Sequence, residues 1–353
     1  MRRRTSPLSR RWLWLGCLAA AVLAALSALS ELSTGSGPRA DVAPVVSVVR
    51  VPLDPAVPAH QQVGALRYLG GLWLSSPDPR FGGLSDLRLT PDGRRAFVIS
   101  DCGRGFTATL SYDAEGRLVG LGEPRLYDLV GLQGQPLAVG EEDSESLVLH
   151  GDAIEVGFEG KARIWAFHFE PPFGGPARAV PSPAGLHGCG SNQGIETMAM
   201  LDATRRLLVC EGRRQPSLDV PAWIGNGTGW TERTYPLRFE GMLGEPFRPT
   251  SATVLPGGDV LVLERRFPPL AARVVRLARE DVLGEGPMHP REIARLEPPL
   301  TVDNMEGIDV RIDESGRTLV YLVSDDNNCA KRPGGPRGTG LQRTLLLLFS
   351  LEE

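Results

Sequence analysis

Acidic residues recur along the chain at the two ends of short hydrophobic runs. The acids that open these runs are Asp86, Glu145, Glu196 and Glu306, with Ser251 at the corresponding place of one further run. The acids that close the runs are Asp101, Glu159, Glu211, Glu264 and Asp325. Carboxylates that lie close together repel one another, and a bound divalent cation, a raised pKa or a basic partner relieves that repulsion.

This acidic set suits a calcium site, because Ca²⁺ accepts a flexible set of oxygen ligands. We predict that the ligands come from both ends of the runs and are Asp86, Glu145, Glu196, Asn304, Glu306 and Asp325. Asn192 and Asn327 are further oxygen donors in the same stretches. The alternative is that each acid caps a turn or pairs with an arginine.

Basic residues follow the closing acids. Four of them are candidates for binding phosphate, namely Arg104, Arg163, Arg213 and Arg265. Arginine binds phosphate oxygens in bidentate fashion, so an alternation of acid and base could bind a cation and a small anionic ester together. The same residues could instead form surface ion pairs, each of which contributes little to stability.

Hairpins carry these residues. The stretch 304–326 contains two β-rich runs, Ile308–Ile312 and Thr318–Val323, around a turn that ends at Gly316. The pattern occurs four more times upstream, and successive closing acids are separated by 58, 52, 53 and 61 positions. A strand-rich repeat of roughly 50 to 60 residues is typical of a β-propeller blade. The opening acids would then begin the innermost strands and gather at one mouth of the central channel.

We therefore predict an all-β fold with a single β-propeller over residues 45–353. Five blade repeats are visible. Further strands are expected at Val45–Val51 and Ala65–Leu74, before the first repeat, and at Thr344–Leu351 near the C-terminus. The N-terminal strands could join the last blade and close the ring, which removes exposed sheet edges, or contribute to a sixth blade. Five or six blades are both compatible with the repeat, and a monomer is favoured.

The N-terminal segment has the composition of an export signal or a membrane anchor. Residues 1–11 are strongly basic, and residues 12–29 are almost wholly apolar. The sequence Ser9-Arg10-Arg11-Trp12-Leu13 resembles a twin-arginine signal, although an ordinary arginine-rich signal is the alternative. With residues 1–30 as signal or anchor and 31–44 as a linker, we predict a protein of the bacterial periplasm or cell envelope, either released or attached to the inner membrane.

Four cysteines remain if Cys17 is removed with the signal. Cys102 and Cys329 follow the closing acids of the first and last repeats, which a closed ring makes neighbours. We predict the pair Cys102–Cys329 and, by difference, the pair Cys189–Cys210. Four buried free thiols are the alternative, because no spacing requires a bridge.

Several classes of function lack their signatures in the sequence. There is no G-x-S-x-G elbow, P-loop, dinucleotide fingerprint or H-E-x-x-H motif, and the five histidines show no metal-ligand spacing. The formal net charge of -4 gives no support for nucleic-acid binding.

The order of several motifs resembles the phytase-like propeller family, which is labelled "esterase-like activity of phytase". The motifs are Gly83-Leu84-Ser85-Asp86, Ser100-Asp101, Asn192-Gln193-Gly194-Ile195-Glu196, Glu264-Arg265-Arg266-Phe267, Asn304-Met305-Glu306-Gly307 and Ser324-Asp325-Asp326-Asn327. The resemblance runs from about Gly82 to Phe349. It implies a β-propeller, export, and metal-assisted hydrolysis of phosphate esters. The stretch around Glu145 departs from the acid-Pro-Glu-Gly pattern of the family.

Two functions follow from these observations. In the first, Glu196, Glu306 and Asp86 are catalytic residues that hold Ca²⁺, which polarises the phosphoryl group and activates water, while the arginines bind the phosphate. In the second, the propeller is not catalytic and binds a ligand or protein partner in the envelope, with the acids serving only structure.

Overall fold

The computed structural model describes residues 43–190, 194–212, 219–238, 244–328 and 341–352. All of them belong to the second of the two compact units of the chain, 41–353. The predicted export segment belongs to the first unit and lies outside the described residues. Within the described ranges, no helix is long and apolar enough to cross a membrane.

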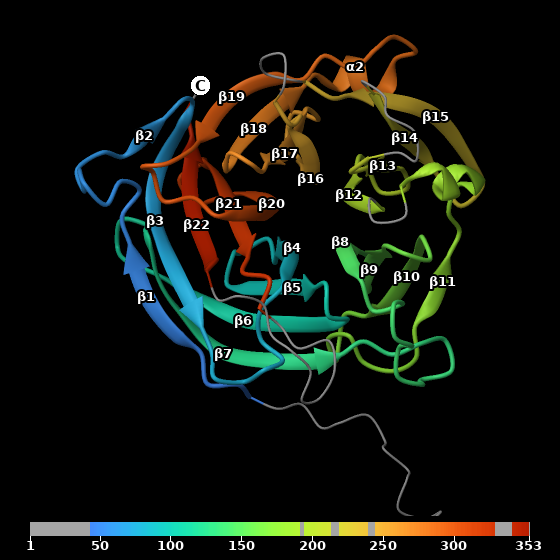
Figure 1. The fold of residues 1–353 in the computed structure, drawn as a ribbon, viewed down its shortest axis with the longest axis horizontal. Coiled ribbons are helices and arrows are strands. Elements are labelled where there is room, and N and C mark those ends of the chain that lie inside the picture. The colour runs from blue at the N-terminus through green and yellow to red at the C-terminus, as the bar shows by residue number, and fades with distance from the viewer. Residues whose placement is uncertain (1–42, 191–193, 213–218, 239–243, 329–340, 353) are drawn as a thin grey trace, which may run out of the picture. The chain divides into compact units, whose positions relative to one another are not determined.

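Five antiparallel sheets are arranged as blades around a central axis, as Figure 1 shows. Blade 1 contains β4 (Leu84–Leu89), β5 (Arg95–Ser100), β6 (Arg104–Tyr112) and β7 (Leu118–Asp128). Blade 2 contains β8 (Ser144–His150), β9 (Ala153–Phe158), β10 (Arg163–His168) and β11 (Arg178–Val180). Blade 3 contains β12 (Ile195–Met200), β13 (Arg206–Cys210), β14 (Asp219–Asn226) and β15 (Gly229–Pro236). Blade 4 contains β16 (Arg248–Val254), β17 (Val260–Arg266), β18 (Ala271–Leu277) and β19 (Arg291–Leu296).

Blade 5 combines the two ends of the propeller. It contains, from the inside outward, β20 (Asn304–Ile312), β21 (Thr318–Asp325), β22 (Thr344–Leu351), β3 (Leu66–Ser75) and β1 (Ser47–Val51), and the short β2 (Gln62–Val63) also pairs with β3. Of the two alternatives that the sequence left open, the N-terminal strands join the last blade and form no sixth blade. The ring is closed by backbone hydrogen bonds between β3 and β22.

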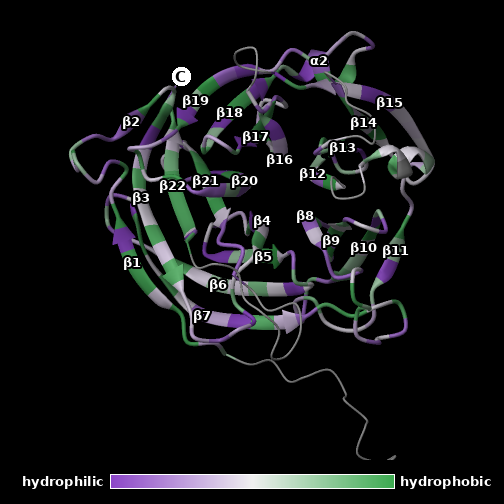
Figure 2. Ribbon diagram, in the orientation of Figure 1, coloured by the Kyte–Doolittle hydropathy of each residue, from purple (hydrophilic) through white to green (hydrophobic). Residues whose placement is uncertain are grey.

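Helical structure in the described ranges is confined to the 3-10 helix η1 (Ala184–Gly188) and the short α2 (Arg279–Leu283). The hydrophobic core is divided among the interfaces between blades. Each of the five hydrophobic clusters contains residues of two neighbouring blades, including one cluster between blades 5 and 1. Figure 2 shows that β22 is hydrophobic over most of its length, and all but the last of its residues are buried. Five interfaces with five clusters mean that burial of apolar surface closes the ring.

The hairpin turns follow the chemistry expected from the sequence. In the turn between β20 and β21, the Asp313 carboxylate accepts hydrogen bonds from the backbone N–H groups of Ser315 and Arg317. Gly316 has a φ of 83°, a conformation that a residue without a Cβ adopts at little cost. The strand before this turn is longer than predicted. It begins at Asn304 instead of Ile308, so the opening acid lies inside the strand.

Candidate functional site

A β-bulge interrupts the innermost strand of every blade at the same place. The register between the innermost and second strands shifts by one residue, so one residue in each innermost strand has no partner opposite it. These bulge residues are Ser85, Glu145, Glu196, Thr250 and Glu306. An extra residue of this kind re-aims its side chain, and such bulges are over-represented beside active sites.

At the end of the second strand, or directly after it, each blade contributes one residue to the same end of the channel. In each innermost strand, the residue before the bulge pairs with a residue of the second strand, and the closing residue is the one directly after that partner. These closing residues are Asp101, Glu159, Glu211, Arg265 and Asp325. The predicted positions were therefore wrong by one residue in blades 1 and 4. The sequence reading placed Asp86 and Ser251 at the opening positions and Glu264 at a closing position, whereas Ser85, Thr250 and Arg265 occupy them.

A cavity of about 870 Å³ lies at this end of the propeller and is called the mouth cavity below. It is lined by four of the five bulge residues and by all five closing residues. Nine acids line it in total: Asp101, Asp143, Glu145, Glu159, Glu196, Glu211, Asp303, Glu306 and Asp325. Arg265 and Arg343 are the arginines that line it. The described wall of the cavity is thus strongly acidic.

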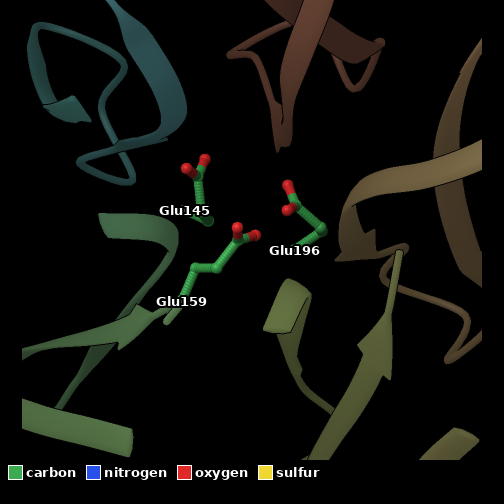
Figure 3. Close-up of side chains that lie close together, drawn as sticks. All are labelled: Glu145, Glu159 and Glu196. Atoms are coloured by element: carbon green, nitrogen blue, oxygen red, sulfur yellow. The ribbon is translucent and has the colours of Figure 1, made fainter. Parts of the chain in front are cut away.

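Three of these acids converge from blades 2 and 3. One carboxylate oxygen each of Glu145, Glu159 and Glu196 lies within 4.8 Å of the other two, and Figure 3 shows the three side chains pointing toward one another. Glu159 and Glu196 are buried, whereas Glu145 is partly exposed. The Gly194 N–H donates to Glu159 Oε2 at 3.0 Å and holds that side chain in place. We call these residues the glutamate triad.

Burial and neighbouring acids raise the pKa values of the three glutamates. Burial, and then the neighbouring acids Asp143 and Asp101, raise the pKa of Glu145 well above its usual value. Burial, and then Glu145 and Glu211, raise the pKa of Glu196 in the same way. The pKa of Glu159 is also raised, mainly by burial. A divalent cation would relieve this repulsion.

The donor set of the triad fits a calcium ion. All three donors are carboxylate oxygens, which hard cations prefer, and Ca–O distances of about 2.3 to 2.6 Å allow two ligands of one ion to lie up to about 5 Å apart. The observed separation of at most 4.8 Å meets that condition. Glu145, Glu159 and Glu196 are therefore the residues of the described chain best placed to hold such an ion.

A second acidic group belongs to blade 5. Asn304 Nδ2 donates to Glu306 Oε1 at 2.7 Å and to Asp325 Oδ2 at 3.3 Å, so one amide orients both carboxylates. Burial raises the pKa of Glu306 to about 7 despite the opposing effect of Arg265. Burial and the nearby Glu306 raise the pKa of Asp325 to about 7.

Arg265 provides a positive charge inside this acidic cavity. Its Nε lies 2.9 Å from Glu306 Oε1, and its Nη2 donates to Glu211 Oε1 at 3.4 Å. Although burial opposes the charge, Glu306 and Glu211 raise the pKa of the guanidinium. Of the predicted phosphate-binding arginines, Arg265 is the one that the structure places at the mouth cavity.

Two other predicted arginines have different surroundings. Arg104 is buried and its Nε lies 3.4 Å from Asp128 Oδ1. The Arg163 guanidinium lies 4.1 Å from the ring centre of Phe158 and 4.2 Å from that of Trp165. Neither side chain lines the mouth cavity. Arg213, the fourth predicted arginine, lies outside the described residues, as does Asn192.

Asp86 is not brought to the acidic cavity. It follows the bulge of blade 1 instead of occupying it, and its carboxylate is completely buried. Oδ1 accepts hydrogen bonds from Arg88 and from the Ser251 hydroxyl across the channel, and Oδ2 accepts one from the Leu147 N–H. These donors hold the carboxylate inside the channel, away from the mouth.

Arg88 completes this arrangement. Its guanidinium donates to the carbonyl oxygens of Met198, Ala252 and Ile308, which belong to blades 3, 4 and 5. Because Asp86 also bonds blade 2 through Leu147, the Asp86–Arg88 pair links all five blades across the channel. Arg88 in turn lines a cavity of about 460 Å³ at the opposite end of the channel. The pair thus has a structural role: it links the blades at a level of the channel between the two cavities.

The sequence reading missed other residues of the site. Asp143 and Asp303 line the mouth cavity, and both lie within three positions before an opening acid, which is the signal that could have identified them. Glu264, read as a closing acid, is instead buried, where it accepts a hydrogen bond from the Tyr235 hydroxyl at 2.5 Å and pairs with Arg273.

A disulfide joins Cys189 and Cys210, as predicted. It connects the loop before β12 to the end of β13 in blade 3. The other predicted pair includes Cys329, which lies outside the described residues, so that pairing stays a prediction.

Comparison with protein families supports the resemblance that the motifs suggested. Residues 79–328 match the family described as "Phytase-like: Esterase-like activity of phytase". The chain belongs to this family. The match spans all five bulges of this phytase-like propeller and most of the lining of the mouth cavity, whereas Leu341, Gln342 and Arg343 of that lining lie beyond the matched range.

Three solved structures with a similar fold share little sequence with this phytase-like propeller. The WD40 repeats of RRP9 are 12% identical, with 88% of this chain and 100% of that chain covered and a TM-score of 0.41. The PQQ-bound aldose sugar dehydrogenase of Streptomyces coelicolor is 14% identical (88% and 99% covered, TM-score 0.40). The gluconolactonase XC5397 of Xanthomonas campestris is 13% identical (88% and 98% covered, TM-score 0.37). No curated protein matched the chain. Likenesses this remote do not bear on function.

Proposed function

We propose that this protein is a phosphoester hydrolase that uses a divalent cation, with Ca²⁺ as the first candidate, at the mouth of the propeller. The observation that carries the proposal is the glutamate triad, whose oxygens lie within 4.8 Å of one another inside a cavity large enough for a small ester. Membership of the phytase-like family supports the reaction class.

The triad would hold the cation through Glu145, Glu159 and Glu196. A bound divalent cation polarises a phosphoryl oxygen and lowers the pKa of bound water. It also neutralises a wall that would otherwise repel an anionic ester, because nine acids and two arginines line the cavity.

Blade 5 supplies groups that can move a proton. Asp325 and Glu306 each have a pKa of about 7, which suits a general base or acid near neutral pH. The Asn304 amide donates to both carboxylates and fixes the oxygens from which a proton would be exchanged. Arg265 lies beside them and contacts Glu306 and Glu211 through Nε and Nη2, so it could bind a phosphate oxygen through Nη1 or by exchanging one of these partners.

The experiment is a hydrolysis assay of the purified protein with nitrophenyl phosphate mono- and diesters. We expect turnover with Ca²⁺, loss of turnover with a chelator, and loss in the double variant Glu145→Gln/Glu196→Gln. Glu155→Gln serves as a control, because Glu155 is buried and paired with Arg206 outside the cavity. If no ester is hydrolysed with saturating Ca²⁺, Mg²⁺, Mn²⁺ or Zn²⁺, the proposal is wrong.

The paired state of Arg265 favours a second candidate. Since that guanidinium already contacts two carboxylates, the propeller could bind a cation and a ligand or partner without catalysis. In that case Ca²⁺ would raise the unfolding temperature although no ester is hydrolysed.

We further propose that the protein acts in the bacterial periplasm or cell envelope, where residues 1–30 direct it or residues 12–29 anchor it. Cell fractionation of the full chain and of a chain with Arg10 and Arg11 changed to Lys tests this. Recovery of both chains in the cytoplasm would contradict export.

A further inference from the structure

One blade reverses the charge pattern of the mouth cavity. At the closing position, blades 1, 2, 3 and 5 carry Asp101, Glu159, Glu211 and Asp325, whereas blade 4 carries Arg265. Blade 4 also has Thr250 at its bulge, where three other blades have glutamate. The repeat therefore places a cationic side chain at a position that is otherwise acidic.

The contacts of Arg265 are those of a cation held by acids of neighbouring blades. Its Nη2 donates to Glu211 Oε1 in blade 3 at 3.4 Å, and its Nε lies 2.9 Å from Glu306 Oε1 in blade 5. Glu211 is a closing residue and Glu306 a bulge residue. The glutamate triad has the same composition, because Glu159 is a closing residue and Glu145 and Glu196 are bulge residues.

We propose that the Arg265 guanidinium fills a second cation position in the mouth cavity, so that the protein binds one divalent cation there instead of two. This inference rests on the proposed cation site at the triad. The permanent charge of arginine repels a divalent ion from Glu211 and Glu306, and it also satisfies their oxygens. Among the described residues, the ion pairs of Arg265 go to Glu211 and Glu306, and Glu196 of the triad contributes less than these two to the raised pKa of the guanidinium. The triad therefore remains the position for the ion.

The inference differs from a phosphate-binding role for Arg265. A residue that only grips substrate would change substrate affinity when replaced, without changing how many cations the apoprotein takes up. A residue that occupies a cation position would change that number in the absence of any substrate.

The test is a count of Ca²⁺ bound per chain, by equilibrium dialysis of the full, substrate-free protein. We expect one Ca²⁺ in the wild-type protein and in Arg265→Lys, and two in Arg265→Gln, with the additional site lost again in Arg265→Gln/Glu306→Gln. Arg343→Gln is the matched control. Arg343 lines the same cavity and its Nε lies 3.3 Å from Asp303 Oδ2, so its replacement changes the net charge equally but should leave the count at one.

The outcomes separate the two proposals. One Ca²⁺ in both the wild-type protein and Arg265→Gln would overturn the role of Arg265 and leave the triad site intact. Two in the wild-type protein, or two in Arg343→Gln, would also overturn it. No Ca²⁺ in any form would overturn the calcium site at the triad and this inference with it, and the proposed function would then be decided by the other divalent cations of the hydrolysis assay. Circular dichroism of each variant establishes that the count is made on folded protein. If Arg265→Gln does not fold, Arg265→Lys still tests the proposal, because a second Ca²⁺ in this variant, which keeps the positive charge, would overturn it.

Discussion

Replacing Glu196 by glutamine should raise stability without a cation, and Ca²⁺ should cancel that advantage by stabilising only the wild-type protein. Glu196 is buried, one of its oxygens lies within 4.8 Å of oxygens of Glu145 and Glu159, and burial with these neighbours raises its pKa well above 4.5. The folded state therefore holds the proton more tightly than the unfolded state. That contribution to stability is present at low pH and is lost as the pH rises. Glutamine keeps the shape and removes the charge.

The magnitude is limited by the pH. At pH 7 the cost of the ionised side chain cannot exceed the cost of protonating it. Because pH 7 lies about 2.5 units above the usual pKa of 4.5, protonation costs at most about 3.5 kcal/mol at about 1.4 kcal/mol per unit. Without a cation, Glu196→Gln should thus raise the unfolding temperature by up to roughly 6 °C for a chain of this size. With Ca²⁺ at a hundred times its Kd, the wild-type protein gains about 2.7 kcal/mol that the variant loses with its ligand.

The assay is thermal unfolding at pH 7 in chelator and in increasing Ca²⁺, repeated in chelator at pH 5, where the advantage of the variant should nearly disappear. Glu155→Gln is the matched control. It removes a partner of the buried Arg206, so it should lower stability by about 3 to 5 kcal/mol with or without Ca²⁺. If Glu196→Gln behaves like Glu155→Gln in chelator, the repulsion inferred for the triad does not exist.

Two further predictions concern the rest of the channel. Because Glu306 and Asp325 each have a pKa of about 7, raised from 4.5 and 3.8, the chelated protein should lose stability as the pH rises from about 4 to 7. Its unfolding temperature should therefore be higher at pH 5 than at pH 8. A double variant Glu306→Gln/Asp325→Asn should reduce this dependence to the part that the glutamate triad contributes, and an unchanged slope in that variant would contradict the assignment. Arg88→Met should lower the free energy of unfolding by about 3 to 5 kcal/mol, because it leaves the buried Asp86 carboxylate without its ion pair. Denaturant unfolding measures this change. The stabilisation by Ca²⁺ should persist in the variant, and its loss would place Asp86 in the cation site.

The blades could be read from the sequence because each one is built from local hairpins. The turn residues and the β-rich runs lie next to one another in the chain, so the repeat is visible without any long-range information. The closure of blade 5 was also foreseeable, since a propeller that leaves strands at both ends of the chain can pair them and remove two sheet edges.

The site was only partly predictable. Glu145, Glu196, Glu306 and Asp325 reach the mouth cavity as expected, but Asp86 does not, because the bulge of blade 1 falls on Ser85. A bulge is defined by the register between two paired strands, so a single strand read by itself does not reveal it. A shift of one residue turns a side chain to the other face of its strand. In blade 1 this shift buries Asp86 inside the channel and places Ser85 at the mouth cavity.

The sequence by itself determined five strand repeats, the acids at their ends and the hairpin turns, because each of these depends on residues that are neighbours in the chain. Only the tertiary structure decided which acids meet. The glutamate triad joins blades 2 and 3, Arg265 joins blades 3 and 5, and the Asp86–Arg88 pair joins all five. These contacts join different blades, so they form only when burial of the hydrophobic interfaces packs the blades around a common axis, in places between residues up to 220 positions apart. Burial at that axis then shifts the pKa values of the acids.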